Sequence, residues 1–392
     1  MKRFDFETLP NRAGTAACKW ERRTPAEKQD GIIAMSIADM EFYCPDFIRE
    51  AVMRAAQHGL YGYTDPYEEY LGTVAGWYRR RHNIHVKEED IICLYGVVPA
   101  LHAAVRAFTR PGDGVIVLNP VYYPFYNAVR NNGRKLVECE LINRDGRYSI
   151  DFDKLDSLAA RPENKLILFC SPHNPVGRVW TREELACLSE ICSRHDITVF
   201  SDEIHFDIIL QGQHTPLLNV PGMEERTLLA TSCSKTFNIP GLQLANVISC
   251  SDRLRDAFRR QTKIDGVDNI SYFGSAAAIA AYRQPDGDMW VEALREKLRR
   301  NAKVFAEFFR DRLPEVVLSP LEGTYLQWAD FRCARMTADQ LADFMRNKAR
   351  LILDEGAIFG PCGEGFERFN LAMPEWAMLQ ALERLDKAWR NR

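Results

Sequence analysis

The sequence predicts an α/β protein in which a large domain with a mainly parallel sheet is joined to a smaller α+β domain. Three observations predict it. The chain has 392 residues, more than a single hydrophobic core usually serves. Its middle part alternates short apolar runs with helical patterns, which is typical of parallel strands joined by helices. After about Ala281 this alternation stops and a long charged helical pattern begins.

The strands of the large domain are predicted from apolar runs of four to six residues. These runs are Ile91–Tyr95, Val115–Leu118, Lys165–Cys170, Ile197–Ser201, Thr227–Thr231 and Asn246–Cys250. Two of the segments between these predicted strands have residue patterns typical of helix starts. Pro99–Phe108 has a proline near its start, and Thr181–His195 opens with a capping threonine followed by acidic residues.

The smaller domain is predicted from the C-terminal pattern. A charged helix from Trp290 to about Phe309 precedes a strand-like stretch at Val316–Phe331. We expect a helix next at Thr337–Lys348, followed by two short strands at Leu351–Ile358 and Arg368–Met373. A closing helix is expected after Pro374. We assign residues 46–283 to the large domain, and residues 1–45 and 284–392 to the small one.

Composition narrows the class of protein. Hydrophobic residues make up 46% and charged residues 27%, and the net charge of −3 with scattered basic clusters argues against a nucleic-acid or anionic-membrane binder. No apolar run is typical of a signal peptide or of a membrane span. The eleven cysteines form no C-x-x-C pair, so we expect free thiols, no structural zinc and a cytoplasmic protein.

Polar residues gather after the predicted strands, where ligands bind in doubly wound sheets. Gly96 follows the first strand and opens a helix whose free N–H groups suit a phosphate. Aromatic side chains follow the second strand. The next three strands are followed by Asn174, by Asp202 with Glu203 and His205, and by Ser232, Ser234 and Lys235. A metal site at Asp202, Glu203 and His205 is the weaker alternative, because no second cluster of carboxylates and histidines supports it.

This combination is what pyridoxal phosphate chemistry requires. A lysine amine forms an imine and moves protons at the substrate Cα. A carboxylate keeps the pyridine nitrogen protonated, so that the ring can accept electrons. An amide and an aromatic ring orient the cofactor, while helix N–H groups and hydroxyls hold its phosphate.

The strand-end segments resemble the signature segments of fold type I pyridoxal phosphate enzymes, the aspartate aminotransferase superfamily. They are Ser171-Pro-His-Asn-Pro-Val-Gly177, Ser201-Asp-Glu-Ile-His205 and Ser232-Cys-Ser-Lys-Thr-Phe-Asn238. Within it the chain resembles the cystathionine β-lyase-like C–S lyases of the MalY/PatB type. The segments that carry this narrower likeness include Ala38-Asp-Met-Glu-Phe42, Gly62-Tyr-Thr64, Pro120-Val-Tyr-Tyr-Pro-Phe125, Gly177-Arg-Val-Trp180 and Gly323-Thr-Tyr-Leu326.

The resemblance implies a role for each matching position. Lys235 would form the Schiff base, Asp202 would face the pyridine nitrogen, and Asn174 would contact O3′ with His205 beside it. Tyr122 would stack on the ring. The phosphate would be held by Gly96, Val97, Val98, Ser232 and Ser234, and by Tyr63 from the other subunit of a homodimer. Arg368 would grip the substrate α-carboxylate, with Ala38 also at the substrate.

One departure favours a lyase over a transaminase. Many aminotransferases carry an arginine eight residues after the lysine, where this chain has Gln243. The leading hypothesis is therefore a C–S β-lyase that acts on cystathionine or a related cysteine thioether and releases pyruvate, ammonia and a thiol. An aminotransferase of class I/II is the first alternative. A regulatory protein that keeps pyridoxal phosphate as a ligand is the second.

Overall fold

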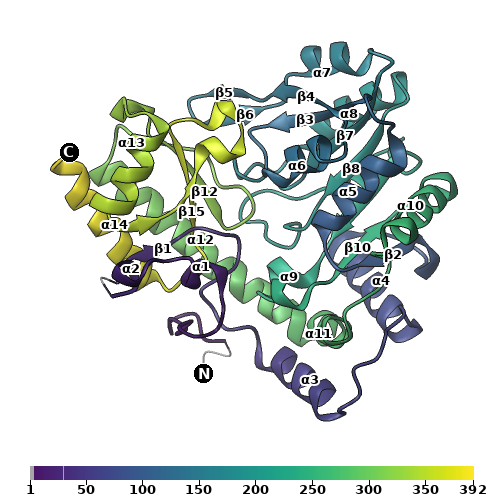
Figure 1. The fold of residues 1–392 in the computed structure, drawn as a ribbon, viewed down its shortest axis with the longest axis horizontal. Helices are drawn as coiled ribbons and strands as arrows, with labels where there is room; N and C mark the ends of the chain where they lie inside the picture. The colour runs from purple at the N-terminus through teal and green to yellow at the C-terminus, as the bar shows by residue number, and fades with distance from the viewer. Residues whose placement is uncertain (1–3, 30) are drawn as a thin grey trace.

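The computed structural model describes residues 4–29 and 31–392, so the first three residues of the predicted small domain and residue 30 lie outside the described residues. A mixed seven-stranded sheet forms the centre of the large part of the molecule (Figure 1). Its strands, in spatial order, are β2 (Ile91–Leu94), β10 (Ala245–Ile248), β9 (Thr227–Thr231), β8 (Thr198–Asp202), β7 (Asn164–Cys170), β3 (Gly114–Asn119) and β4 (Lys135–Glu140). β10 is antiparallel to both neighbours, whereas the pairs from β9 to β4 are parallel. The predicted α/β class with a mainly parallel sheet is confirmed.

Helices bury both faces of this sheet, which is why its strands are continuous apolar runs. Val115 and Val117 of β3 face a core shared with α5 (Val97–Phe108), α6 (Pro124–Arg130) and α10 (Asp252–Asp265). Ile116 and Leu118 face the opposite core, which α7 (Phe152–Ala159) and α8 (Arg182–Arg194) cover. Helix α8 starts as predicted, because the Thr181 hydroxyl accepts from the Glu184 N–H in a capping box.

The smaller sheet lies in the C-terminal part of the chain. Its strands, in spatial order, are β11 (Val317–Leu318), β12 (Leu326–Asp330), β15 (Phe366–Asn370) and β14 (Asp354–Glu355). The neighbouring helices are α12 (Asp286–Arg312), α13 (Ala338–Asp343) and α14 (Glu375–Arg390). The single strand-like stretch predicted at Val316–Phe331 is wrong, because a loop separates β11 from β12.

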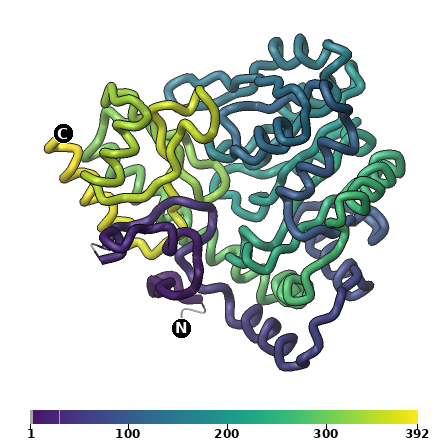
Figure 2. Tube along the Cα trace, viewed as in Figure 1, coloured from purple at the N-terminus to yellow at the C-terminus, as the bar shows by residue number. Residues whose placement is uncertain are grey.

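The N-terminal segment joins the C-terminal part. Strand β1 (Ile33–Ala34) pairs in parallel with β13 (Leu351–Ile352), and the N-terminal segment lies against the C-terminal part of the chain (Figures 1 and 2). The other elements are α1 (Cys18–Glu21), α2 (Pro25–Gln29), α3 (Asp46–Gln57), α4 (Glu68–His82), β5 (Ile142–Arg144), β6 (Arg147–Ser149), α9 (Cys233–Thr236) and α11 (Tyr272–Tyr282). Within the described part of the chain, every helix is too short or too polar to span a membrane.

A buried carboxyl group in the small sheet gives a testable pH dependence. Glu367 of β15 is buried, and its Oε2 atom has no hydrogen-bond partner among the described residues. Burial raises the pKa of Glu367 well above its usual range, and the charges of Glu355 and Asp354 raise it further. The folded protein therefore keeps a proton that the unfolded chain has already lost above about pH 4.5, so stability falls as pH rises through this window.

We expect Glu367→Gln to remove this loss, because the amide has the shape of the carboxyl group and does not ionise. The gain should be near zero at pH 4 and grow by up to about 1.4 kcal/mol for each pH unit above about 4.5, until the pH reaches the pKa of folded Glu367. Urea unfolding at several pH values measures it, with the exposed Glu364→Gln as the matched control. A gain that is the same at pH 4 and pH 8 would contradict the ionisation argument.

Candidate active site

Four neighbouring strands of the large sheet deliver the predicted site residues. Asp202 is the last residue of β8, and Lys235 lies on the four-residue helix α9 that follows β9. The loops after β3 and β7 carry Tyr122 and Asn174, which are linked because the Tyr122 N–H donates to the Asn174 carbonyl at 3.2 Å. These four strands are parallel, so their carboxyl ends meet at one edge of the sheet, as predicted.

Lys235 is held through both its helix and its amine. The Ser232 hydroxyl caps α9 by accepting from the Ser234 N–H at 3.0 Å and donates to the Leu244 carbonyl at 2.5 Å. The Lys235 Nζ donates to the Ala38 carbonyl at 2.7 Å. Burial lowers the pKa of Lys235 to about 8, with Asp39 raising it and Arg368 lowering it further. An amine with this pKa is partly neutral near pH 8, which a nucleophile or proton acceptor requires.

Asp202 is a buried carboxyl group. It is 5% exposed, and its Oδ1 accepts from the Ile204 N–H at 3.2 Å. Burial raises the pKa of Asp202 to about 7, although the Lys235 charge lowers it. A cationic N–H donor placed beside this group would stabilise its ionised form.

Arg368 of β15 reaches the site from the small sheet. Its Nη1 donates to Asn174 Oδ1 at 2.7 Å, and its Nη2 donates to Asp354 Oδ2 at 2.5 Å. Its guanidinium carbon lies 4.7 Å from the centre of the Phe359 ring. The arginine is buried, and its Nε atom has no hydrogen-bond partner among the described residues. The structure thus brings Asn174 and Arg368, 194 positions apart in the chain, into direct contact.

His205 lies next to these groups, since both Lys235 and Arg368 influence its ionisation. Burial lowers the pKa of His205 well below its usual range, and the two positive charges lower it further. Its ring packs edge to face on Tyr325 at 5.6 Å, and among the described residues its Nδ1 atom has no partner. His205 is therefore a neutral ring with one unused polar atom.

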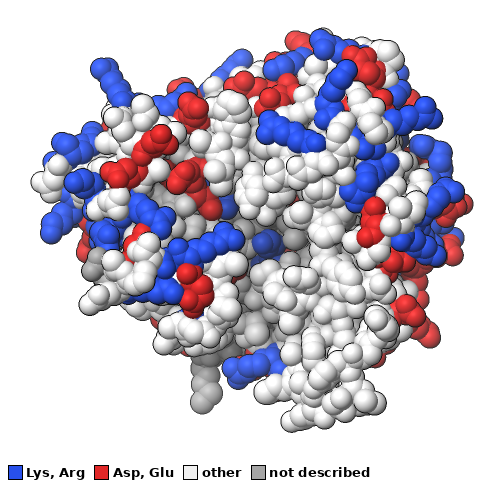
Figure 3. Space-filling view, viewed as in Figure 1, with Lys and Arg blue, Asp and Glu red and all other residues white. Residues whose placement is uncertain are grey.

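Three of the residues expected at a phosphate, Gly96, Val97 and Val98, lie at the start of α5. Gly96 is the N-cap residue, and no side chain caps this helix end. Tyr63 is fully exposed and lies with Tyr95 and Gln243 around an open cavity of about 290 Å³. The structure therefore leaves Tyr63 outside its own chain's lysine site. Figure 3 shows a hollow between the two parts of the molecule, with a basic side chain at its base.

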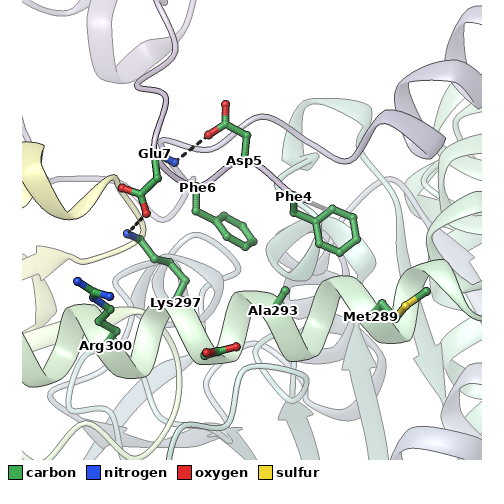
Figure 4. A pocket seen from close by; sticks show the side chains of 9 residues that line it. Phe4, Asp5, Phe6, Glu7, Met289, Ala293, Lys297 and Arg300 are labelled. Atoms are coloured by element: carbon green, nitrogen blue, oxygen red, sulfur yellow. Dashed lines mark hydrogen bonds and ion pairs between the residues drawn. The ribbon is translucent and has the colours of Figure 1, made fainter. Parts of the chain in front are cut away.

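A separate cavity of about 820 Å³ lies between the N-terminal segment and α12 (Figure 4). Phe4 and Phe6 lie over the helix, and Glu7 Oε1 accepts from Lys297 Nζ at 3.0 Å. None of the predicted site residues lines it. This cavity is not the candidate site.

Several polar residues near Lys235 were not predicted from the sequence. The Tyr325 hydroxyl donates to the same Ala38 carbonyl as Lys235, at 2.9 Å, although its Gly-Thr-Tyr-Leu motif was visible. Buried Asp207 accepts from Thr236 Oγ1 at 2.9 Å and lies 2.8 Å from His82 Nε2. Thr236 is the residue after Lys235, so Asp207 steadies the lysine's helix.

The fold and the strand-end segments can be compared with known protein families. The model described as aminotransferase class I and II matches residues 30–385. The chain belongs to this family.

Individual relatives narrow the likeness. The chain is 37% identical to cystathionine β-lyase PatB of Bacillus subtilis, covering 98% of this chain and 100% of that protein. It is 32% identical to protein MalY of Escherichia coli, covering 95% of each. Among solved structures it matches cystalysin from Treponema denticola, which contains pyridoxal 5′-phosphate, with a TM-score of 0.94, 39% identity and 99% of both chains covered. The predicted resemblance to fold type I enzymes of the MalY/PatB type is confirmed.

Proposed function

We propose that the protein is a pyridoxal phosphate-dependent C–S β-lyase that cleaves L-cystathionine or a related cysteine thioether. The observation that carries this proposal is the meeting of a lysine with lowered pKa, a buried carboxyl group and a buried arginine at one edge of the sheet. The match to cystathionine β-lyase PatB, which covers 98% of this chain and 100% of that protein, supports the reaction.

The donor set fits the cofactor. Burial raises the pKa of Asp202, so a protonated ring nitrogen beside it would stabilise its ionised form, and the buried His205 Nδ1 has no hydrogen-bond partner among the described residues. Asn174 would orient the cofactor's O3′, and Tyr122 would stack on its ring. Gly96, Val97 and Val98 would offer the N-terminus of α5 to the phosphate, with Ser232 and Ser234 beside it. No arginine lies at position 243 to share that charge.

Each catalytic group has a defined task. Pyridoxal phosphate, when bound, supplies an aldehyde that forms an imine with amines and a ring that withdraws electrons from the substrate Cα. Lys235 holds the cofactor between turnovers, and its neutral amine removes the Cα proton. Arg368 binds the substrate α-carboxylate and so fixes which Cα bond faces the lysine. The sulfur at Cβ then leaves as a thiol, and the remaining fragment hydrolyses to pyruvate and ammonia.

Product analysis tests the reaction. We expect L-cystathionine to yield pyruvate, ammonia and homocysteine in equal amounts, because Gln243 departs from the transaminase pattern and the sequence carries no obvious motif for a second carboxylate-binding arginine. In a parallel incubation, an amino donor and a 2-oxo acid should exchange their amino group more slowly. Faster amino transfer than pyruvate release would favour the aminotransferase alternative and leave the cofactor assignment standing.

We also propose a homodimer in which Tyr63 reaches the phosphate of the partner site. Large hydrophobic side chains are exposed along α3 and the segment after it: Met53, Leu60, Tyr61, Tyr63 and Tyr67. On the face that Figure 3 shows, few charged side chains lie over this region, although α3 also carries exposed charged residues, Asp46, Arg49, Glu50 and Arg54. Exposed apolar surface of this kind marks an interaction site. We also propose that residues 46–283 form the large domain and that residues 1–45 and 284–392 form the small one, which the pairing of β1 with β13 supports. A cytoplasmic location is proposed as well, and the eleven free cysteines support it.

Mixed dimers test the role of Tyr63. We expect Tyr63→Phe and Lys235→Ala proteins, each weakly active or inactive, to regain up to about a quarter of wild-type activity per site after subunit exchange. One of the two hybrid sites then contains both natural residues. Lys235→Ala mixed with Lys235→Met is the control and should regain nothing. A fully active monomer in sedimentation would contradict the shared site.

A further inference from the structure

Segment 36–42, which precedes α3, lies across the candidate site and is held at many points. The Ala38 carbonyl accepts from both Lys235 and Tyr325. Asn370 donates its side-chain amide to the Ile37 and Asp39 carbonyls, both at 2.7 Å. The segment therefore fixes the position of the carbonyl that binds the lysine amine.

Ile37 adopts a conformation that its own side chain disfavours. Its φ is +56°, in the left-handed region, where a β-branched residue is an outlier. Such a conformation persists when the surrounding contacts over-determine it. Here the Ile37 carbonyl is held by Asn370, and the Ile37 N–H donates to Asp354 Oδ2 at 2.8 Å.

The same oxygen of Asp354 also binds Arg368. Asp354 Oδ2 accepts from Arg368 Nη2 at 2.5 Å, and the pairing of β14 with β15 places the two residues opposite each other. The side chain of Asp354 is 14% exposed and that of Arg368 is 3% exposed, so water competes little for this contact. One carboxylate oxygen thus joins the arginine to the backbone of segment 36–42.

We propose that Asp354 is a positioning residue that couples carboxylate binding at Arg368 to the position of the Ala38 carbonyl beside Lys235. The inference rests on the proposed function in one respect, the binding of the substrate carboxylate by Arg368. Asp354 binds Nη2 of the guanidinium, whereas Asn174 binds Nη1, and Asp354 also holds Ile37 one residue before the carbonyl that contacts the lysine. Coupling between two sites is reciprocal, so a carboxylate bound at Arg368 also strengthens the hold on Ile37.

A ligand that cannot react tests this coupling without turnover. The probe is 3-(methylthio)propionate, which has the carboxylate and the thioether but no amine. Calorimetry on the holoenzyme measures its affinity. Hydrogen exchange with mass spectrometry on the peptide that contains Ile37 measures the hold on segment 36–42. In the wild-type protein we expect the probe to slow this exchange.

Asp354→Ala is expected to weaken probe binding by roughly 10- to 100-fold, the loss typical of one charge-assisted hydrogen bond. Exchange at Ile37 should become about 10-fold faster, and saturating probe should no longer slow it. The exposed neighbour Glu355→Ala is the matched control and should behave as wild type. If Asp354→Ala does not fold, Asp354→Asn decides, with a smaller loss of about 5-fold because the hydrogen bond becomes neutral.

Two outcomes overturn the proposal in distinguishable ways. If the folded Asp354 variant binds the probe within twofold of wild type and the probe still slows exchange at Ile37, the coupling is absent and the proposed function stands. If Arg368→Ala binds the probe as tightly as wild type, Arg368 is not the carboxylate site, and that part of the proposed function fails together with the coupling.

Discussion

Replacing Lys235 with alanine should lower kcat/KM for cysteine thioethers by at least about 10⁴-fold, the upper end of what one positioned proton-transfer group contributes. The loss has two causes, because the same amine holds the cofactor and takes the Cα proton. The visible absorbance of the cofactor's Schiff base with the protein should vanish too. Among the described residues, the Lys235 side chain hydrogen-bonds to the Ala38 carbonyl alone, so the variant should fold.

The matched control for this variant is Lys263→Ala, which removes an exposed lysine at the end of α10. It should leave the activity and the absorbance unchanged. Circular dichroism and thermal unfolding establish that both variants are folded. A Lys235→Ala protein that keeps a tenth of the wild-type kcat/KM would sink the assignment.

Arg368→Ala should lower kcat/KM by roughly 30- to 5,000-fold. The removal of one partner from a buried charged pair costs about 2–5 kcal/mol, and each 1.4 kcal/mol corresponds to a tenfold change. Two losses contribute: the substrate carboxylate loses its partner, and Asp354 is left without its cation. Arg368→Lys should restore little, because an ammonium group cannot bond Asn174, Asp354 and a substrate carboxylate in one plane.

Steady-state kinetics on cystathionine measure this effect, and the exposed Arg182→Ala is the control. Arg368→Lys activity within threefold of wild type would show that charge alone suffices and that the planar contacts are unnecessary. The experiment reports on the carboxylate site and not on the choice between lyase and transaminase, since both reactions hold the same carboxylate.

The large sheet was predictable because helices bury both of its faces. The six predicted strands lie within two residues of the observed ones, since a doubly buried strand is a continuous apolar run. Edge strand β4 was missed because its exposed and half-buried residues break that run. In the small sheet, β11 and β14 have two residues each, too few for any periodic signal.

The residues of the candidate site also fall into two groups, those that the sequence could predict and those that it could not. Asp202 ends strand β8, and Asn174 and Lys235 come shortly after the ends of β7 and β9, so the rule for strand ends could find them. Asp354 and Tyr325 reach the site only through tertiary structure, and the contact from Asp354 to Ile37 spans 317 positions. Tyr325 lies in the Gly-Thr-Tyr-Leu segment that carries the family likeness, but no local pattern marks Asp354, because its role depends on which distant backbone group it meets.

The central claim is that the strand ends assemble a cofactor site around Lys235. Borohydride reduction of the purified protein with pyridoxal phosphate, followed by proteolysis and mass spectrometry, tests it most directly. The account predicts one phosphopyridoxyl group per chain, on the peptide that contains Lys235. A reduced adduct on any other lysine, with Lys235 unmodified, would contradict it.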